Sequence, residues 1–153
     1  MQEEFIFEID FLPTVPTELI ESLENIELRE NASRLKIPEA YASRYTSHEL
    51  HNWAQSFFDY PIAIRWQIQY IDLPPHIDFD YAKTGFKYIY YVDLGGKDVR
   101  TCYYASTEPD SKIIYEKTPV VNTWYSIKID KPHGTIGLSV PPRVSLFIKK
   151  FIP

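Results

Sequence analysis

The alternation of apolar and polar residues after Pro61 constrains the fold of this 153-residue chain more than any other feature. Across residues 62–70 every second residue is apolar or aromatic, and the residues between them include Arg65, Gln67 and Gln69. A period of two is typical of a β-strand with one buried face. Further strands are expected at Phe86–Leu94, Val99–Ala105, Lys112–Glu116, Val120–Ile129, Thr135–Val140 and Val144–Phe151. Short strands with Pro and Gly at their joints predict a mainly β fold with antiparallel strands.

The first 60 residues are expected to add a strand and two short helices. Phe5–Phe11 alternates like a half-buried strand with all its aromatic residues on one face, and Thr17 can cap a short helix. A clearer helix is predicted from about Ser47 to Phe58, where Thr46 and Glu49 fit a capping box. Its apolar stripe consists of Leu50, Trp53, Ala54 and Phe57. We therefore predict one domain over residues 1–153, a double-stranded β-helix (a cupin-like jelly roll) with these helices packed outside it.

Charge and composition disfavour two classes of partner and one compartment. The net charge is −5 and the sequence pI is about 5.4, so binding to long nucleic acid is not expected. Cys102 is the only cysteine, which rules out an internal disulfide. Residues 1–4 are acidic rather than basic, and no apolar run approaches the length of a membrane span. A cytoplasmic protein that binds no membrane is the expectation.

Three residues in two distant stretches have the chemistry of a metal site. His76 and Asp78 are two positions apart in an extended segment, so their side chains can project to the same side. Pro74 and Pro75 stiffen the backbone before them. On its own this pattern also fits a surface loop. His133 follows a predicted strand later in the chain, and two imidazoles with one carboxylate form the facial triad typical of non-haem Fe(II).

Arg143 and Ser145 form a candidate site for a carboxylate. They lie two positions apart on the last predicted strand and therefore point the same way, while Val144, Leu146 and Ile148 would face the core. The guanidinium group of arginine offers two parallel N–H donors to a carboxylate and stays charged at any working pH. A surface salt bridge for Arg143 and an exposed position for Ser145 is the alternative interpretation.

The ordered set of His76-x-Asp78, His133 and Arg143-x-Ser145 resembles the Fe(II)/2-oxoglutarate-dependent oxygenase superfamily. The phrases Lys131-Pro132-His133-Gly134 and Pro142-Arg143-Val144-Ser145-Leu146 are most similar to small phage-type and prolyl-hydroxylase-like members. The resemblance covers about residues 65–153. It implies that His76, Asp78 and His133 are catalytic and bind Fe(II). It also implies that Arg143 and Ser145 bind 2-oxoglutarate as co-substrate and that O₂ is the oxidant.

Other residues receive weaker assignments. Gln67 is our candidate for a hydrogen bond to 2-oxoglutarate, because the family often places a polar side chain on that strand; a solvated outer face explains it equally well. Tyr88 and Tyr90 share a face and are considered as phenol donors to the same acid, with packing as the alternative. Asn122 and Trp124 are considered at the pocket mouth. His48 and His51 lie on the predicted helix, and a surface role is expected for both.

The favoured function is an oxygenase, probably-hydroxylating in the family's manner, that acts on a peptide side chain or small metabolite. One rival is a cupin-type metal enzyme that does not use 2-oxoglutarate. Such sites usually have further ligands, and only four histidines are present. The other rival is a non-enzymatic β-sandwich module for binding or phage structure.

Overall fold

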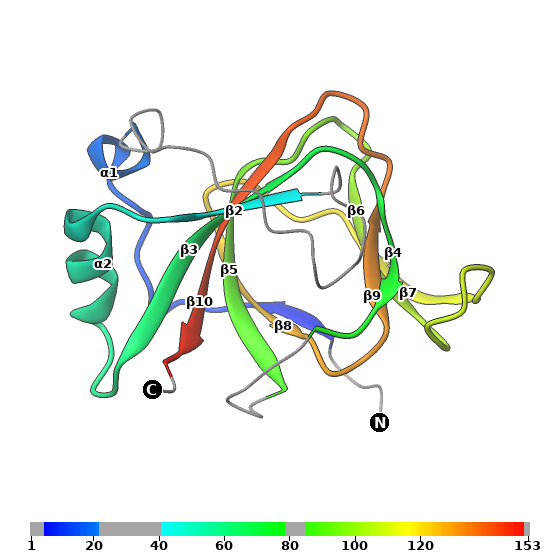
Figure 1. The fold of residues 1–153 in the computed structure, drawn as a ribbon, viewed down its shortest axis with the longest axis horizontal. Helices are drawn as coiled ribbons and strands as arrows, with labels where there is room; N and C mark the ends of the chain where they lie inside the picture. Colours follow the sequence, from blue (N-terminus) through cyan, green and yellow to red (C-terminus); the bar gives the residue numbers. More distant parts are fainter. Residues whose placement is uncertain (1–4, 22–40, 79–84, 152–153) are drawn as a thin grey trace.

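The computed structural model describes residues 5–21, 41–78 and 85–151, and these residues form two antiparallel sheets (Figure 1). The elements are β1 Ile6–Glu8, α1 Thr17–Glu21, β2 Tyr41–Tyr45, α2 His48–Gln55, β3 Ile62–Gln69, β4 Leu73–His76, β5 Phe86–Asp93, β6 Arg100–Tyr104, β7 Ile113–Lys117, β8 Trp124–Lys128, β9 His133–Ile136 and β10 Arg143–Lys150. The larger sheet has the order β1-β8-β5-β10-β3-β2 and the smaller one the order β4-β9-β6-β7. The predicted jelly roll is confirmed.

The outer face of the six-stranded sheet is covered by helices. Both α1 and α2 lie on the side of this sheet that faces away from the four-stranded sheet (Figure 1). Leu50 and Ala54 of α2 are fully buried and pack into one cluster with Trp66, Leu146 and Ile148 of strands β3 and β10. Removing this apolar surface from water stabilises the fold and fixes which face of each strand points inward.

The opposite face of the same sheet lines the interior of the jelly roll. Ile89 and Tyr91 of β5 pack there with Tyr125 and Ile127 of β8. Because side chains alternate along a strand, the odd-numbered residues of β3, β5 and β10 all project into this interior. The polar residues of these rows therefore lie between the two sheets, where a site can form.

Two predictions for the N-terminal part are wrong in detail. Strand β1 ends at Glu8, and Phe7 and Phe11 are 42% and 50% exposed, so the predicted row of buried aromatic residues does not form. The backbone leaves the sheet because Ile9 makes its hydrogen bond to Trp124 at the end of the β1–β8 pairing. The strand β2, which pairs with β3 at the edge of the sheet, was not predicted from the sequence.

The helix α2 begins one residue later than its predicted cap. Ser47 is the N-cap and its hydroxyl accepts from the Leu50 amide, whereas the Thr46 hydroxyl donates to the Ile64 carbonyl at 3.2 Å. Phe57 follows the end of the helix and is 38% exposed, so it contributes less to packing than Leu50 does. The predicted packing of the helix outside the barrel is otherwise observed. Among the described residues, no helix has the length and apolarity needed to cross a membrane.

Candidate metal centre

The pairing of β4 with β9 brings the two candidate histidines together. His76 is the last residue of β4 and His133 is the first of β9, and they are direct partners across the antiparallel ladder. Their ring centroids are 4.5 Å apart. Asp78 follows β4, and its amide donates to the Ile129 carbonyl at 3.0 Å, which anchors this segment next to the chain that leads into β9. The local hydrogen bonding therefore positions all three side chains.

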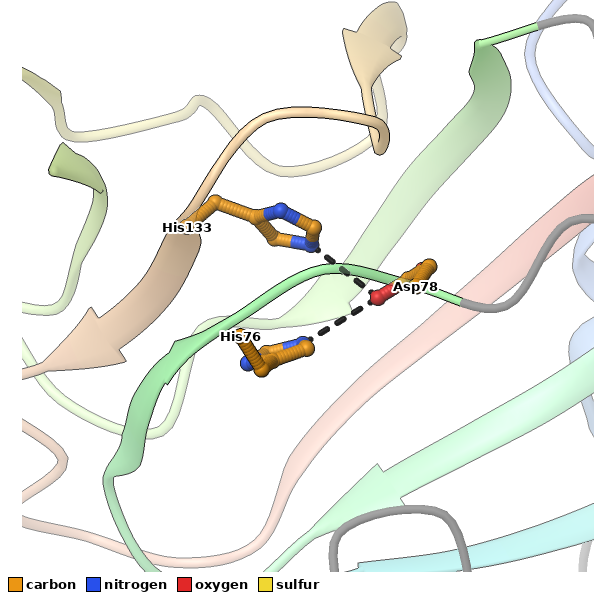
Figure 2. Close-up of side chains that lie close together, drawn as sticks. All are labelled: His76, Asp78 and His133. Carbon is orange, nitrogen blue, oxygen red and sulfur yellow. Dashed lines mark ion pairs between the residues drawn. The ribbon is translucent and has the colours of Figure 1, made fainter. Parts of the chain in front are cut away.

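The three side chains converge on a single point (Figure 2). The Oδ1 atom of Asp78 is 3.1 Å from Nε2 of His76 and 3.1 Å from Nε2 of His133. One ligand atom from each residue lies within 4.8 Å of the other two, which is close enough for all three to bind one ion. His133 is buried, and the other two residues are partly exposed.

Backbone carbonyls fix the orientation of both imidazole rings. Nδ1 of His76 is 2.8 Å from the Pro74 carbonyl oxygen, and Nδ1 of His133 is 2.7 Å from the Lys131 carbonyl oxygen. Since a carbonyl oxygen only accepts, each Nδ1 carries the hydrogen. In the neutral rings each Nε2 then directs a lone pair toward Asp78, and a cation between the three ligands resolves the repulsion. The donor set therefore fits a divalent metal.

Lys87 contacts the carboxylate from the other side. Its Nζ atom is 3.1 Å from Oδ2 of Asp78, and its side chain is 8% exposed. Burial alone raises the pKa of Asp78, but the Lys87 ammonium and hydrogen bonds from His133 and His76 outweigh it and hold this pKa well below its usual range. Asp78 is therefore ionised at neutral pH, as a metal ligand must be.

Arg143 is a buried cation without a carboxylate partner among the described residues. It is 4% exposed, and its guanidinium group lies over the Tyr91 ring at 4.5 Å. Nη1 donates to the Thr135 hydroxyl at 2.8 Å and Nη2 to the Thr101 hydroxyl at 3.0 Å. These neutral partners fix the plane of the group but leave its charge uncompensated, which favours an anionic ligand.

One cavity joins the metal group to this arginine. Its volume of about 50 Å³ has room for roughly four water molecules. The residues that line it include His76, Asp78, His133, Lys87, Arg143, Ser145, Gln67, Gln69, Tyr91, Thr101 and Thr135. The structure thus brings all six predicted site residues to the same small polar cavity, and their roles remain predictions.

Ser145 and Gln67 lie side by side in this cavity. They are direct partners on the neighbouring strands β10 and β3, and both residues project inward. Gln69, the next inward residue of β3, donates to the Ile71 carbonyl at 3.0 Å. Among the described residues the Gln67 side chain has no hydrogen-bond partner, so its amide is available to a ligand.

The considered role of Tyr88 and Tyr90 is wrong because both project to the outer face. They pack against the outer cluster, and the Tyr90 hydroxyl donates to Asn122 at 3.2 Å. The indole of Trp124 donates to the Pro13 carbonyl at 2.9 Å, so neither Asn122 nor Trp124 lines the cavity. The error has a simple origin, since β5 carries aromatic residues on both faces and its alternation does not show which face is inner.

Four cavity residues were not found from the sequence: Lys87, Tyr91, Thr101 and Thr135. Only the register signals them, because Tyr91 is the β5 partner of Ser145, and Thr101 is the β6 partner of Thr135. His48 and His51 lie on α2, outside the six-stranded sheet and outside the metal group. His48 is exposed, in agreement with the expected surface role.

Comparisons with known proteins define the fold but not the family. By sequence, no protein-family model and no curated protein matches the chain. By structure, it is similar to a Pseudomonas putida prolyl-4-hydroxylase with 12% identity and a TM-score of 0.56, covering 96% of this chain and 91% of that chain. It is also similar to Bacillus subtilis oxalate decarboxylase variants, with 16% identity and a TM-score of 0.46. The match covers 86% of this chain and only 28% of the decarboxylase. The first likeness supports the jelly-roll fold alone.

Proposed function

We propose that the protein is an Fe(II)- and 2-oxoglutarate-dependent oxygenase that hydroxylates a peptide side chain or a small metabolite. One observation carries this proposal. A single cavity contains the three-residue metal group and Arg143, a buried cation with no carboxylate partner among the described residues. A dicarboxylic acid that binds both a metal and a guanidinium group satisfies both features.

His76, Asp78 and His133 would hold Fe(II) through two imidazole nitrogens and one carboxylate oxygen. Such a set leaves three coordination positions open, as in non-haem Fe(II) oxygenases. When bound, the metal and 2-oxoglutarate together supply the activation of O₂. The carbonyl oxygens of Pro74 and Lys131 keep the imidazole rings in the ligating orientation, and this contribution comes from the protein alone.

Arg143 would bind the distal carboxylate of 2-oxoglutarate. It is the better anchor of the two cavity cations, because Lys87 is already paired with Asp78. Thr101, Thr135 and the Tyr91 ring hold its guanidinium group in place before any ligand arrives, which lowers the entropic cost of binding. The Ser145 hydroxyl and the Gln67 amide add neutral hydrogen bonds from the neighbouring positions.

The nature of the prime substrate is a further part of the proposal. The small cavity is occupied by co-substrate in this account, so the prime substrate binds at its opening. The shared fold with a bacterial prolyl-4-hydroxylase supports a hydroxylation reaction on a peptide side chain, although a small metabolite fits the same arrangement. A cupin-type enzyme that does not use 2-oxoglutarate gives no role to the unpaired charge of Arg143.

The test is conversion of 2-oxoglutarate to succinate by protein supplied with Fe(II) and ascorbate in air. We expect wild type to release succinate without added prime substrate and Arg143→Ala to release none above the protein-free background. Arg100→Ala is the matched control, since Arg100 is a partly exposed arginine whose ion pair with Glu116 lies outside the cavity. Wild-type protein that holds metal but neither binds nor consumes 2-oxoglutarate would contradict the proposal.

A further inference from the structure

We propose that Lys87 restricts Asp78 to one metal-binding oxygen and thereby keeps a coordination position open for O₂. The inference rests on the proposed function for the identity of the metal and the co-substrate. Its structural basis is independent of that function, because it concerns the different environments of the two carboxylate oxygens of Asp78.

The two oxygens of Asp78 have separate partners. Oδ1 lies 3.1 Å from Nε2 of each histidine and thus faces the centre of the metal group. Oδ2 lies 3.1 Å from Nζ of Lys87, on the opposite side. A carboxylate held in this way presents Oδ1 to the metal while Oδ2 remains bonded to the ammonium group.

Lys87 is held firmly enough to compete for that oxygen. It is on the inward row of β5, opposite Ile127 of β8, and its side chain is 8% exposed. Its ammonium group also lies 4.7 Å from the centre of the Phe147 ring. In such a poorly solvated place an ion pair is stronger than in water, and neither charge can leave without a large desolvation cost.

The number of open positions depends on this arrangement. A six-coordinate Fe(II) bound by two imidazoles and one oxygen has three positions left, two of which a chelating 2-oxo acid fills. The third stays open for O₂. If Oδ2 also bound the metal, the protein and the co-substrate together would fill all six positions. Lys87 is therefore a positioning residue for the reaction with O₂ rather than for the binding of metal or co-substrate.

The experiment compares Lys87→Met with Lys87→Gln, Lys87→Arg and a control, Lys97→Met. Methionine keeps an unbranched side chain without the charge, and Lys97 is an exposed lysine in the β5–β6 turn whose loss changes the net charge equally. Metal and 2-oxoglutarate affinities are measured by calorimetry with Mn(II). Nitric oxide, which binds Fe(II) where O₂ does, is then titrated anaerobically into the Fe(II)–2-oxoglutarate complex and followed by electron paramagnetic resonance.

The expected result separates binding from access. Lys87→Met and Lys87→Gln should bind metal at least as tightly as wild type, and up to roughly tenfold more tightly, because a neighbouring cation is gone and a second oxygen is available. The same variants should lose at least about tenfold in affinity for nitric oxide. Lys87→Arg, which keeps a cation, should recover most of the nitric oxide binding, and Lys97→Met should match wild type.

Three outcomes overturn the inference. Unchanged nitric oxide affinity in both neutral variants means that Lys87 does not control the number of bound oxygens, and the proposed function is untouched. Weaker metal binding in those variants, with their far-ultraviolet circular dichroism unchanged, means that Lys87 only holds Asp78 in place. Failure of wild type to bind metal or 2-oxoglutarate removes the proposed function and the inference with it.

Discussion

The two faces of the six-stranded sheet differ in what their side chains do. On β3 and β10 the outward residues, among them Trp66, Leu146 and Ile148, pack beneath α2 into an apolar cluster. The inward residues of the same two strands include Gln67, Arg143 and Ser145, which line the cavity. Successive side chains of a strand point to opposite faces, so one short segment contributes to the stability of the fold and to the candidate site at once.

This separation has an energetic consequence. Burying Arg143 and Lys87 costs desolvation free energy that their hydroxyl and carboxylate partners only partly offset. The apolar outer cluster compensates for that cost. Substitutions on the outer face should therefore change the free energy of unfolding, and substitutions on the inner face should change ligand binding.

The largest effect is expected for Asp78→Ala on metal binding. The change removes the only carboxylate of the metal group, and because loss of a supporting residue already costs 10–100-fold in metal affinity, loss of this ligand should cost on the order of 1,000-fold or more. Mn(II) titration measures it. Asp98→Ala, at an exposed acid outside the group, is the control, and equal affinities in the two variants would place the metal elsewhere.

Leu146→Ala should separate the two faces in the other direction. Leu146 is fully buried in the outer cluster, so its truncation should lower the free energy of unfolding by about 2–5 kcal/mol. Metal affinity of the folded variant should stay within about threefold of wild type, because no cavity residue changes. Denaturant unfolding and Mn(II) titration test the pair of expectations. A large loss of metal affinity with a small loss of stability would break the distinction between the faces.

A smaller change is expected from pH in metal-free protein. The folded pKa of Asp78 lies well below the ordinary value of about 3.9, so the unfolded chain takes up the proton more readily. The resulting stabilisation is present above pH 4 and is lost as pH falls from that value through the folded pKa. Asp78→Asn should flatten the dependence of unfolding free energy on pH in this acidic range. An unchanged slope would show that Asp78 is not the group responsible.

Ser145→Ala should have a modest effect that is confined to the co-substrate. Loss of one neutral hydrogen-bond donor costs about 1 kcal/mol, or roughly fivefold in 2-oxoglutarate affinity. Metal affinity and unfolding free energy should be nearly unchanged. Calorimetry with Mn(II)-loaded protein provides the measurement, and wild-type affinity in this variant would remove Ser145 from the proposed binding site.

No effect at all is expected from changing His48 and His51 together to Gln. Both residues lie on α2, on the far side of the six-stranded sheet from the cavity (Figure 1). Metal content and succinate release should equal those of wild type. A large loss of bound metal in this double variant would mean that the site involves the wrong pair of histidines.

The sequence predicted the parts that local periodicity determines. The period of two placed Arg143 and Ser145 on one face of β10 and Leu146 and Ile148 on the other, as observed. The same rule brought His76 and Asp78 to one side of an extended segment. What it did not supply was the parity of β5, where aromatic residues on both faces concealed that Tyr91 rather than Tyr90 points inward.

Contacts set by strand pairing were beyond the sequence. Lys87 reaches Asp78 from another sheet, and Thr101 and Thr135 reach Arg143 only because β6 and β9 pair and then face β10 across the interior. No short-range pattern encodes such contacts. They follow from the register and from the packing of the two sheets, both of which depend on the whole fold.

The affinity of Mn(II)-loaded protein for 2-oxoglutarate tests the central claim most directly, with Arg143→Ala and Arg143→Lys measured beside wild type. We predict that wild type binds and that Arg143→Ala loses roughly 30- to 1,000-fold, about 2–4 kcal/mol, while its metal affinity is unchanged. Arg143→Lys should be intermediate, because it keeps the charge and loses the paired donors. Equal 2-oxoglutarate affinity in all three proteins, or no binding by metal-loaded wild type, would contradict the account.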